Sequence, residues 1–469
     1  MSDQTEIAVV DELVARARAA QAGYADGATQ ERYDRAAQAA AWAIMEPARN
    51  AEMAELAVRT TGLGNVKDKI LKNHRKTLGL MRDLSKAKTC GVIEEEATTG
   101  ITKIARPIGV VGAVVPSTNP VATPANNIIN ALKCGNAIIL SPSPKGVEAC
   151  TRLLGYIHAE FDKMGVSRDL VQMIPPPGTK ARTQRLLETA DLVIVTGSQD
   201  NVRRAYSSGT PAIGVGAGNA TVIVDETADT RDAAQKIAAS KTFDNATSCS
   251  SENAVIVVDS VYDEFVAALA EFGGATVSPA LEPQIVERLW PGGKLNRNAL
   301  AKDADVLIDT LQLHDHVDAG TRFIAVPTSG VGKSYPLSGE KLSLVLALYR
   351  ASDFDSAKEL AGRLLAHQGA GHSVGLHSRD DARAVGLGRD LPTCRVIVNQ
   401  AHCFATGGAF NNGLPFSLSM GCGSWGGNSI DENLHWKHFL NITKVVRETD
   451  PDEPSVDQIF QDYWAEAGK

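Results

Sequence analysis

Continuous apolar runs of membrane-spanning length and an aromatic-rich composition are both absent from this sequence. Of its 469 residues, 5% are aromatic, 43% hydrophobic and 22% charged, an ordinary balance for a globular chain. A membrane-crossing helix needs roughly 20 consecutive apolar residues. No stretch reaches that length, so we expect no membrane partner. The N-terminal stretch carries acidic residues and no continuous apolar core, which argues against a secretory signal.

Blocks of basic residues are missing as well. Lys and Arg number 47 and Asp and Glu number 55, so the net charge is -8. Proteins that hold nucleic acid usually show a basic patch or stripe, so we expect no nucleic-acid partner. The length allows two or three domains with a large core.

Cysteines are scattered, odd in number and without a CxxC pair. This pattern predicts neither a metal site nor a disulfide framework, and it is typical of a reducing compartment. We therefore expect a cytoplasmic protein. The seven cysteines are Cys90, Cys134, Cys150, Cys249, Cys394, Cys403 and Cys422.

Helical and strand patterns alternate in a way that predicts an α/β fold. Residues 5–86 read as helices, and residues 90–105 alternate around a Thr-Thr-Gly turn, as in a two-stranded ribbon. Short apolar strands then alternate with helices, which predicts a parallel, doubly wound sheet, and a second alternation follows Cys249. The expected strands are 109–115, 136–140, 170–174, 191–195 and 220–224, then 254–258, 323–326, 342–349 and 396–399.

The stretch KTFDNATSCSSEN, Lys241 to Asn253, places a cysteine in a small-residue turn between a helix and a strand. Cys249 is flanked by serines, so a ligand can reach it. A free cysteine, with a pKa of about 8.5, holds a few per cent of the nucleophilic thiolate at neutral pH. The turn alone supports two interpretations equally, a catalytic nucleophile or a small residue packed in a buried turn.

Polar turns follow the expected strands, where ligands bind in a parallel sheet. Asn119 lies between Pro116 and Pro120. A rigid amide there could donate to an oxyanion, although an ordinary turn residue is the simpler interpretation. The segment 141–144, SPSP, leads into a helix whose free N–H groups could hold a phosphate, with simple N-capping as an equal alternative.

Two further motifs carry weaker signals. GVGAGN at 214–219 lacks the usual dinucleotide-loop spacing and is better interpreted as a tight backbone passage beside a site. His402 in NQAHCFATGG is a candidate site residue, although a lone histidine is more often structural.

Together these stretches resemble the aldehyde dehydrogenase superfamily, in its coenzyme A-acylating branch. The segments that carry the resemblance run in the family's order and cover most of the chain. They are PSTNP at 116–120, TGS at 196–198, YSSGTPAIGVGAGN at 206–219, FDNATSCSSEN at 243–253, GEKLS at 339–343 and GCGSWGGNS at 421–429.

The resemblance implies a role for several of these residues. Cys249 corresponds to the catalytic thiol, and Asn119 to the amide that holds the oxyanion together with the backbone N–H of Cys249. Ser198 corresponds to a residue near the nicotinamide, and Glu340 to the glutamate that holds the nicotinamide ribose. The implied cofactor-binding set is Thr118, Ser141, Pro142, Ser143, Gly197, Ser198, Gly214, Glu340 and Leu342.

Two departures from the hydrolytic members of the superfamily are informative. Those members carry a Glu-Leu-Gly-Gly stretch whose glutamate activates water, and residues 214–217 here read Gly-Val-Gly-Ala. Without that base, a thioester on Cys249 should survive until the thiol of coenzyme A arrives. Ser141 and Ser143 stand where those members have a Lys-Pro-Ser-Glu pattern, so the choice between NAD and NADP stays open.

The resemblance implies a reversible oxidation of a short aldehyde to its coenzyme A thioester. The stretch PFSLSMGCGSWGGNS and the tail VDQIFQDYW most resemble enzymes that act on sulfoacetaldehyde, with succinic semialdehyde and acetaldehyde as alternatives. His402 and Thr406 belong to a segment similar to the loop that lines the aldehyde tunnel. We therefore expect them to contact an anionic aldehyde.

The same resemblance implies a domain plan. We expect a Rossmann-type cofactor domain over 1–240 with an oligomerisation β-ribbon at 90–105, a catalytic thiol domain over 241–428, and a C-terminal oligomerisation segment over 429–469. A homodimer or homotetramer follows. The alternatives are a hydrolytic dehydrogenase and a non-catalytic nucleotide-binding or shell-associated protein, in which residues 6–20 would be a targeting helix rather than an ordinary first helix.

Overall fold

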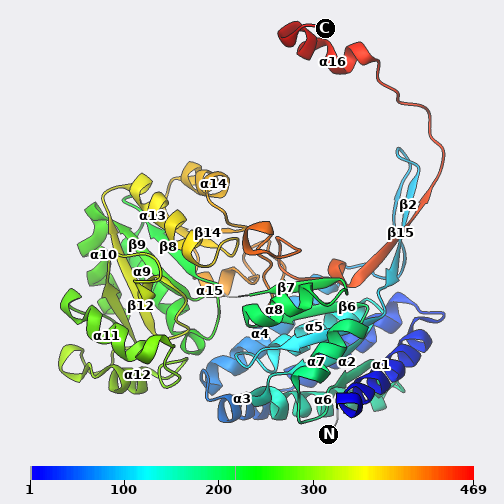
Figure 1. Ribbon diagram of the computed structural model, residues 1–469, viewed down its shortest axis with the longest axis horizontal. Coiled ribbons are helices and arrows are strands. Elements are labelled where there is room, and N and C mark those ends of the chain that lie inside the picture. The colour runs from blue at the N-terminus through cyan, green and yellow to red at the C-terminus, as the bar shows by residue number, and fades with distance from the viewer. Residues whose placement is uncertain (1–2, 217) are drawn as a thin grey trace.

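Three β-sheets organise the chain, and the computed structural model describes residues 3–216 and 218–469 (Figure 1). Two are parallel sheets, each in its own lobe, and the third is a small antiparallel sheet that extends away from both. The predicted α/β class is confirmed. No helix in the described part of the chain has the length and apolar character needed to cross a membrane.

The N-terminal region is helical, as predicted. Local side-chain caps start its helices, since Thr29 accepts a hydrogen bond from the N–H of Arg32, and Asn65 accepts one from the N–H of Asp68. Gly62, with a φ of 68°, ends the third helix in the left-handed region. The four helices are α1 (Asp3–Ala25), α2 (Gln30–Met45), α3 (Pro47–Thr61) and α4 (Val66–Leu84).

The first parallel sheet has five strands in the order β5-β4-β3-β6-β7. Its central strands are buried along their whole length, as expected of a parallel sheet covered on both faces. The strands are β3 (Val110–Val115), β4 (Ala137–Pro142), β5 (Val171–Met173), β6 (Leu192–Thr196) and β7 (Ala212–Val215). The helices are α5 (Ala122–Lys133), α6 (Val147–Asp162), α7 (Lys180–Thr189) and α8 (Gln199–Tyr206).

The second parallel sheet has seven strands in the order β10-β11-β12-β9-β8-β13-β14. Its strands are β8 (Ala220–Val224), β9 (Glu252–Val258), β10 (Gly274–Thr276), β11 (Phe323–Pro327), β12 (Val345–Ala351), β13 (Val374–His377) and β14 (Val396–Val398). Its helices are α9 (Thr230–Thr242), α10 (Asp259–Glu271), α11 (Glu282–Leu289), α12 (Ala304–Leu311), α13 (Phe354–His367), α14 (Asp381–Asp390) and α15 (His402–Ala405).

The change of sheet falls earlier than the predicted domain boundary at residue 240. Strand β8 pairs with β9 and β13 and so belongs to the second sheet. A boundary at 240 would cut through that sheet. The sequence pattern could not locate this change, because β8 is a short apolar strand like those before it. Only the pairing partners of a strand show to which parallel sheet it belongs.

The third sheet consists of the predicted ribbon and one strand that the sequence did not predict. β1 (Gly91–Glu96) pairs with β2 (Ile101–Pro107), and β15 (Leu440–Val446) covers the other edge of β2. Beyond β15 an extended segment leads to α16 (Val456–Ala467), which lies far from both lobes in Figure 1. The C-terminal arm, residues 440–469, therefore continues the ribbon outward.

Candidate active site

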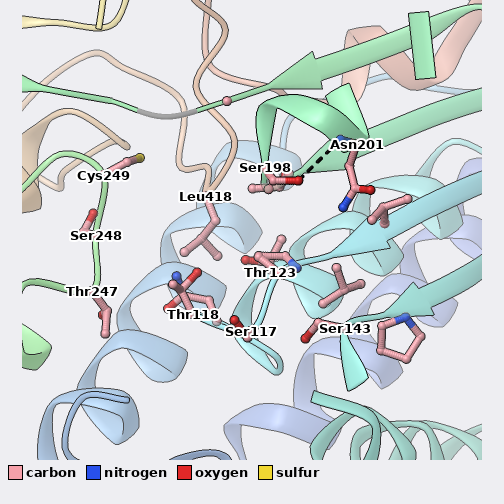
Figure 2. A pocket seen from close by; sticks show the side chains of 18 of the residues that line it. Ser117, Thr118, Thr123, Ser143, Ser198, Asn201, Thr247, Ser248, Cys249 and Leu418 are labelled. Atoms are coloured by element: carbon pink, nitrogen blue, oxygen red, sulfur yellow. Dashed lines mark hydrogen bonds between the residues drawn. The ribbon is translucent and has the colours of Figure 1, made fainter. Parts of the chain in front are cut away.

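A cavity of about 610 Å³ lies at the carboxyl ends of β3, β4 and β6, between the first sheet and the turn that carries Cys249. In Figure 2, Thr247, Ser248 and Cys249 line one side of it, and Ser198 and Ser143 line the other. This is the edge of a parallel sheet at which ligands bind.

The turn before Cys249 has an unusual backbone and is tied to helix α4. Asp244, Asn245 and Ala246 have φ angles of 49°, 52° and 59°, in the left-handed region that residues other than glycine rarely adopt. The buried carboxylate of Asp244 accepts hydrogen bonds from Lys69 at 3.0 Å and Lys72 at 2.5 Å. These bonds hold the strained turn in place.

His372 lies against the thiol of Cys249. Its Nε2 is 3.4 Å from Sγ, and its Nδ1 is 2.7 Å from the hydroxyl of Ser373. Burial, and then the charge of Arg395, lower the pKa of His372 to about 3, so its ring is neutral at physiological pH. If Nδ1–H donates to Ser373, the lone pair of Nε2 faces the thiol and can accept its proton.

The Cys249 thiol is itself neutral in this environment. Burial raises its pKa to about 12, and the nearby Glu340 carboxylate adds to that effect. A resting thiolate is therefore scarce, and Nε2 of neutral His372 is a base within reach of the thiol proton as Cys249 attacks. No local sequence pattern predicts His372 as a site residue, because it lies 123 residues from Cys249 in the chain.

Asn119 is oriented by Lys72. The ammonium of Lys72 donates to Oδ1 of Asn119 at 3.0 Å and to the hydroxyl of Thr247 at 3.0 Å. Because Oδ1 is occupied as an acceptor, the NH₂ group of Asn119 is the end that remains available to donate. The side chain therefore presents a donor in the cavity that Cys249 also lines.

Glu340 also lines the cavity. Its Oε1 accepts a hydrogen bond from the N–H of Gly218 at 3.3 Å, and burial raises its pKa to about 8. Leu342, two residues on, has a φ of 45° and lines the cavity too. This carboxyl group is therefore mostly protonated at neutral pH, so it can donate as well as accept hydrogen bonds.

The predicted cofactor-binding residues are largely brought together. Ser198 caps α8 and accepts a hydrogen bond from the N–H of Asn201 at 3.4 Å (Figure 2). Gly214 is the exception, because it lies within β7, packs against Val202 and does not line the cavity. The predicted residues that line the cavity are Thr118, Ser141, Pro142, Ser143, Gly197, Ser198, Glu340 and Leu342.

The structure does not bring His402 and Thr406 to the cavity. Both side chains are completely buried, and Nδ1 of His402 is 2.8 Å from the carbonyl of Ser250. Burial lowers the pKa of His402 to about 4, so it carries no positive charge for an anion. Their neighbours Cys403 and Gly407 line the cavity instead.

The model of the aldehyde dehydrogenase family matches residues 3–286, more than half of the chain. The chain belongs to the aldehyde dehydrogenase family. Its resemblance to the acylating branch is confirmed by relatives that cover almost the whole chain.

Three of these relatives are informative. An acylating sulfoacetaldehyde dehydrogenase from Cupriavidus necator is 55% identical over 469 residues, which cover 99% of this chain and 94% of that protein. The crystal structure of an acetylating aldehyde dehydrogenase from Geobacillus thermoglucosidasius superimposes with a TM-score of 0.91 at 32% identity, over 97% of this chain and 99% of that one. A propionaldehyde dehydrogenase from Rhodopseudomonas palustris, solved with bound propionyl-CoA, has a TM-score of 0.82 at 25% identity, over 93% and 94% of the two chains.

The segment that distinguishes this family member from hydrolytic relatives lies on the cavity wall. Gly216 lines the cavity, and Ala217 lies outside the described residues. None of residues 214–219 is acidic. A carbon atom added at Gly216 would lie 2.1 Å from Nε2 of Gln199, the end of an exposed, flexible side chain that would have to move. A water-activating carboxylate is therefore absent from this stretch.

The sheet end of the cavity fits the dinucleotide that this family uses. The hydroxyl of Ser143 is buried without a hydrogen-bond partner, so it has an unused donor and acceptor. A carbon atom added at Gly197 would meet nothing within 4 Å, which leaves open space beside the cap of α8. Together they offer polar groups and room for a ribose and phosphates at a helix N-terminus.

Proposed function

We propose that this protein is a coenzyme A-acylating dehydrogenase and that sulfoacetaldehyde is its substrate. The observation that carries the proposal is the pairing of Cys249 with neutral His372 at 3.4 Å in the cavity where Asn119 presents its amide donor. The 55% identity to an acylating sulfoacetaldehyde dehydrogenase supports the choice of aldehyde.

The first step is the attack of the thiol on the carbonyl carbon. Sγ of Cys249 forms the new bond, its proton passes to Nε2 of His372, and the carbonyl electrons move onto the oxygen. The NH₂ group of Asn119 and the backbone N–H of Cys249 donate to that oxygen. One such donor is worth roughly two to three orders of magnitude in rate.

Oxidation and acyl transfer complete the reaction. When bound, a nicotinamide cofactor, NAD or NADP, would supply the hydride acceptor, and loss of the hydride from the adduct would leave an acyl thioester on Cys249. His372 first releases the proton that it took from Cys249. The thiol of coenzyme A then attacks the thioester carbonyl and gives its proton to the imidazole of His372, which passes it to the departing sulfur of Cys249. Cys249 leaves as the thiol, and the acyl group departs on coenzyme A. Because residues 214–219 offer no carboxylate to activate water, the thioester is not hydrolysed before the thiol of coenzyme A reacts with it.

The C-terminal arm supports a homo-oligomer. Four large apolar side chains of α16 are exposed at the spacing i, i+3, i+4 and i+7, so they form one unpartnered helix face. The arm leads away from both lobes, so its own chain leaves that face uncovered (Figure 1). A second copy of this chain is the occupant that we propose. The seven cysteines are free thiols, which supports a cytoplasmic location.

The proposed function is tested by cofactor reduction, followed by absorbance. Sulfoacetaldehyde, succinic semialdehyde and acetaldehyde are each assayed with and without coenzyme A, and with NAD or NADP. We expect turnover that requires coenzyme A and a kcat/KM highest for sulfoacetaldehyde. Steady turnover without coenzyme A would instead mean that the enzyme is hydrolytic.

Two thiols of the same cavity supply a matched comparison. Cys249→Ala should abolish cofactor reduction, whereas Cys403→Ala, which removes another cysteine that lines the cavity, should retain it. Asn119→Ala should lower kcat by about 100- to 1000-fold without abolishing it. Activity in Cys249→Ala would rule out the assigned nucleophile.

A further inference from the structure

Two cations of helix α4, Arg75 and Lys76, line the cavity. The guanidinium of Arg75 donates to the carbonyl of Phe404 at 3.0 Å, and the ammonium of Lys76 donates to the carbonyl of Gly407 at 2.5 Å. Within residues 3–216 and 218–469, neither side chain forms an ion pair with an Asp or Glu. Burying a charge without a counter-ion is unfavourable, so these two groups favour an anion from outside the chain.

A neighbouring lysine on the same helix shows the contrast. Lys72, one turn before Lys76, also lines the cavity, but its ammonium lies 2.5 Å from the carboxylate of Asp244. Burial, and then the charge of Arg75, lower the pKa of Lys76 to about 7. The protein therefore gives Lys72 an internal carboxylate, which it shares with Lys69, and within residues 3–216 and 218–469 gives Arg75 and Lys76 none.

Aromatic rings and a glycine hold the two cations in place. The guanidinium of Arg75 lies 5.1 Å from the ring centroid of Phe404, and the ammonium of Lys76 lies 5.6 Å from that of Phe416. A carbon atom added at Gly407 would lie 2.6 Å from Nζ of Lys76, so the missing side chain there leaves room for the ammonium. Both charges are thus fixed at the cavity wall rather than extended into solvent.

Sulfoacetaldehyde carries its sulfonate on the carbon next to the carbonyl. An anion site for this substrate must therefore belong to the same cavity as Sγ of Cys249, and Arg75 and Lys76 meet that condition. Building on the proposed function, we propose that Arg75 and Lys76 form a subsite that binds the sulfonate of the aldehyde. This subsite makes the enzyme select an anionic aldehyde over an uncharged one.

The test compares the two aldehydes in charge-removing variants. Lys76→Met and Arg75→Gln should each raise the KM for sulfoacetaldehyde about 10- to 100-fold, the value of a lost charged hydrogen bond. The KM for acetaldehyde, which lacks the sulfonate, should change less than about threefold, well below the increase expected for sulfoacetaldehyde. Lys76→Arg keeps the charge and should recover much of the discrimination.

Arg82→Gln is the matched control. Arg82 lies on the same helix and packs over Phe416, but it pairs with Asp83 at 2.8 Å and does not line the cavity. Its removal should leave both KM values unchanged. If Lys76→Met raised both KM values equally, or raised the KM for coenzyme A or the nicotinamide cofactor instead, the sulfonate subsite would be refuted.

A second measurement needs no turnover. The probe is 2-hydroxyethanesulfonate, which should slow the alkylation of Cys249 by iodoacetamide in the wild type but not in Lys76→Met, with ethanol as the uncharged control. No protection of the wild type would overturn the subsite. Protection without any turnover of sulfoacetaldehyde would leave the subsite standing and overturn the proposed function alone.

Discussion

The ammonium of Lys72 joins Asn119 to Asp244, donating to the amide oxygen at 3.0 Å and to the buried carboxylate at 2.5 Å. The lysine therefore ties the proposed oxyanion donor to the turn that carries Cys249. Because it acts through Asn119, Lys72 is a positioning residue. An amide that is free to rotate would spend part of its time with its oxygen toward the substrate. That oxygen would repel the negative charge that develops on the substrate oxygen.

Lys72→Met should accordingly lower kcat by about tenfold or more, since a misplaced donor loses part of the 100- to 1000-fold that a full oxyanion donor supplies. The measurement is steady-state kinetics with the double variant Lys72→Met/Asn119→Ala as the decisive comparison. We expect the double variant to be no slower than Asn119→Ala alone. If the losses in kcat of the two single variants multiplied in the double variant, Lys72 would act independently of the amide.

Asp244→Asn should destabilise the fold. The substitution leaves Lys69 and Lys72 buried beside a neutral amide, and breaking a buried ion pair in this way typically costs about 3–5 kcal/mol of unfolding free energy. Denaturant titration measures the difference in unfolding free energy between wild type and variant. Asp225 is unsuitable as a control because Arg383 pairs with it. Asp68, which also borders this turn but forms no ion pair in the described residues, supplies the control Asp68→Asn.

The pH dependence of the same difference has a defined sign. Burial alone would raise the pKa of Asp244, but Lys72 and Lys69 outweigh burial and leave it lowered. A carboxyl with a lowered folded-state pKa stabilises the fold above its unfolded pKa of about 3.9 and loses that contribution as the pH falls. The difference in unfolding free energy between wild type and Asp244→Asn should thus shrink as the pH falls into the acid range.

Glu340→Gln should make Cys249 react faster with iodoacetamide in the absence of cofactor. Glu340 is the second cause, after burial, of the raised thiol pKa, and its own pKa is raised to about 8. Below that pH the carboxyl is mostly neutral and affects the thiol little. Above it, the carboxylate disfavours the thiolate. The alkylation rate of the variant relative to the wild type should therefore increase as the pH passes through about 8. A ratio that does not change with pH would contradict this coupling.

Local motifs made most of the fold and part of the site predictable. Short apolar strands flanked by helices predict a parallel sheet, and Cys249, Asn119 and Glu340 each lie in a distinctive stretch of sequence. β7 was not predicted because Ala212–Val215 is only four residues long and contains a glycine, so it shows little strand pattern between its flanking turns. β15 escaped because it joins the ribbon only through pairing with β2, more than 300 positions away.

The unpredicted parts of the site depend on contacts between distant segments. His372 follows a Gly-Ala-Gly stretch, and only the folded chain brings it to Cys249. Arg75 and Lys76 look like ordinary charges of an amphipathic helix, and their unpaired burial is visible only in three dimensions. His402 shows the converse, because a histidine beside a substrate loop in sequence is buried and neutral in the fold.

The exposed face of α16 leads to a prediction about assembly. Val456, Ile459, Phe460 and Tyr463 are 62%, 59%, 45% and 63% exposed, and burying their exposed apolar area favours association by roughly 25 cal/mol per Å². If a second copy covers this face, Ile459→Asp should shift the protein toward smaller species in sedimentation velocity, because it places a charge in the contact.

Gln461→Asp supplies the matched control for that variant. It adds the same charge to the same helix outside the series 456, 459, 460 and 463, so the assembly should persist. Loss of assembly in both variants would mean that charge on the arm, not its apolar face, governs association. An unchanged assembly in Ile459→Asp would leave the ribbon of β1, β2 and β15 as the contact and exclude α16 from it.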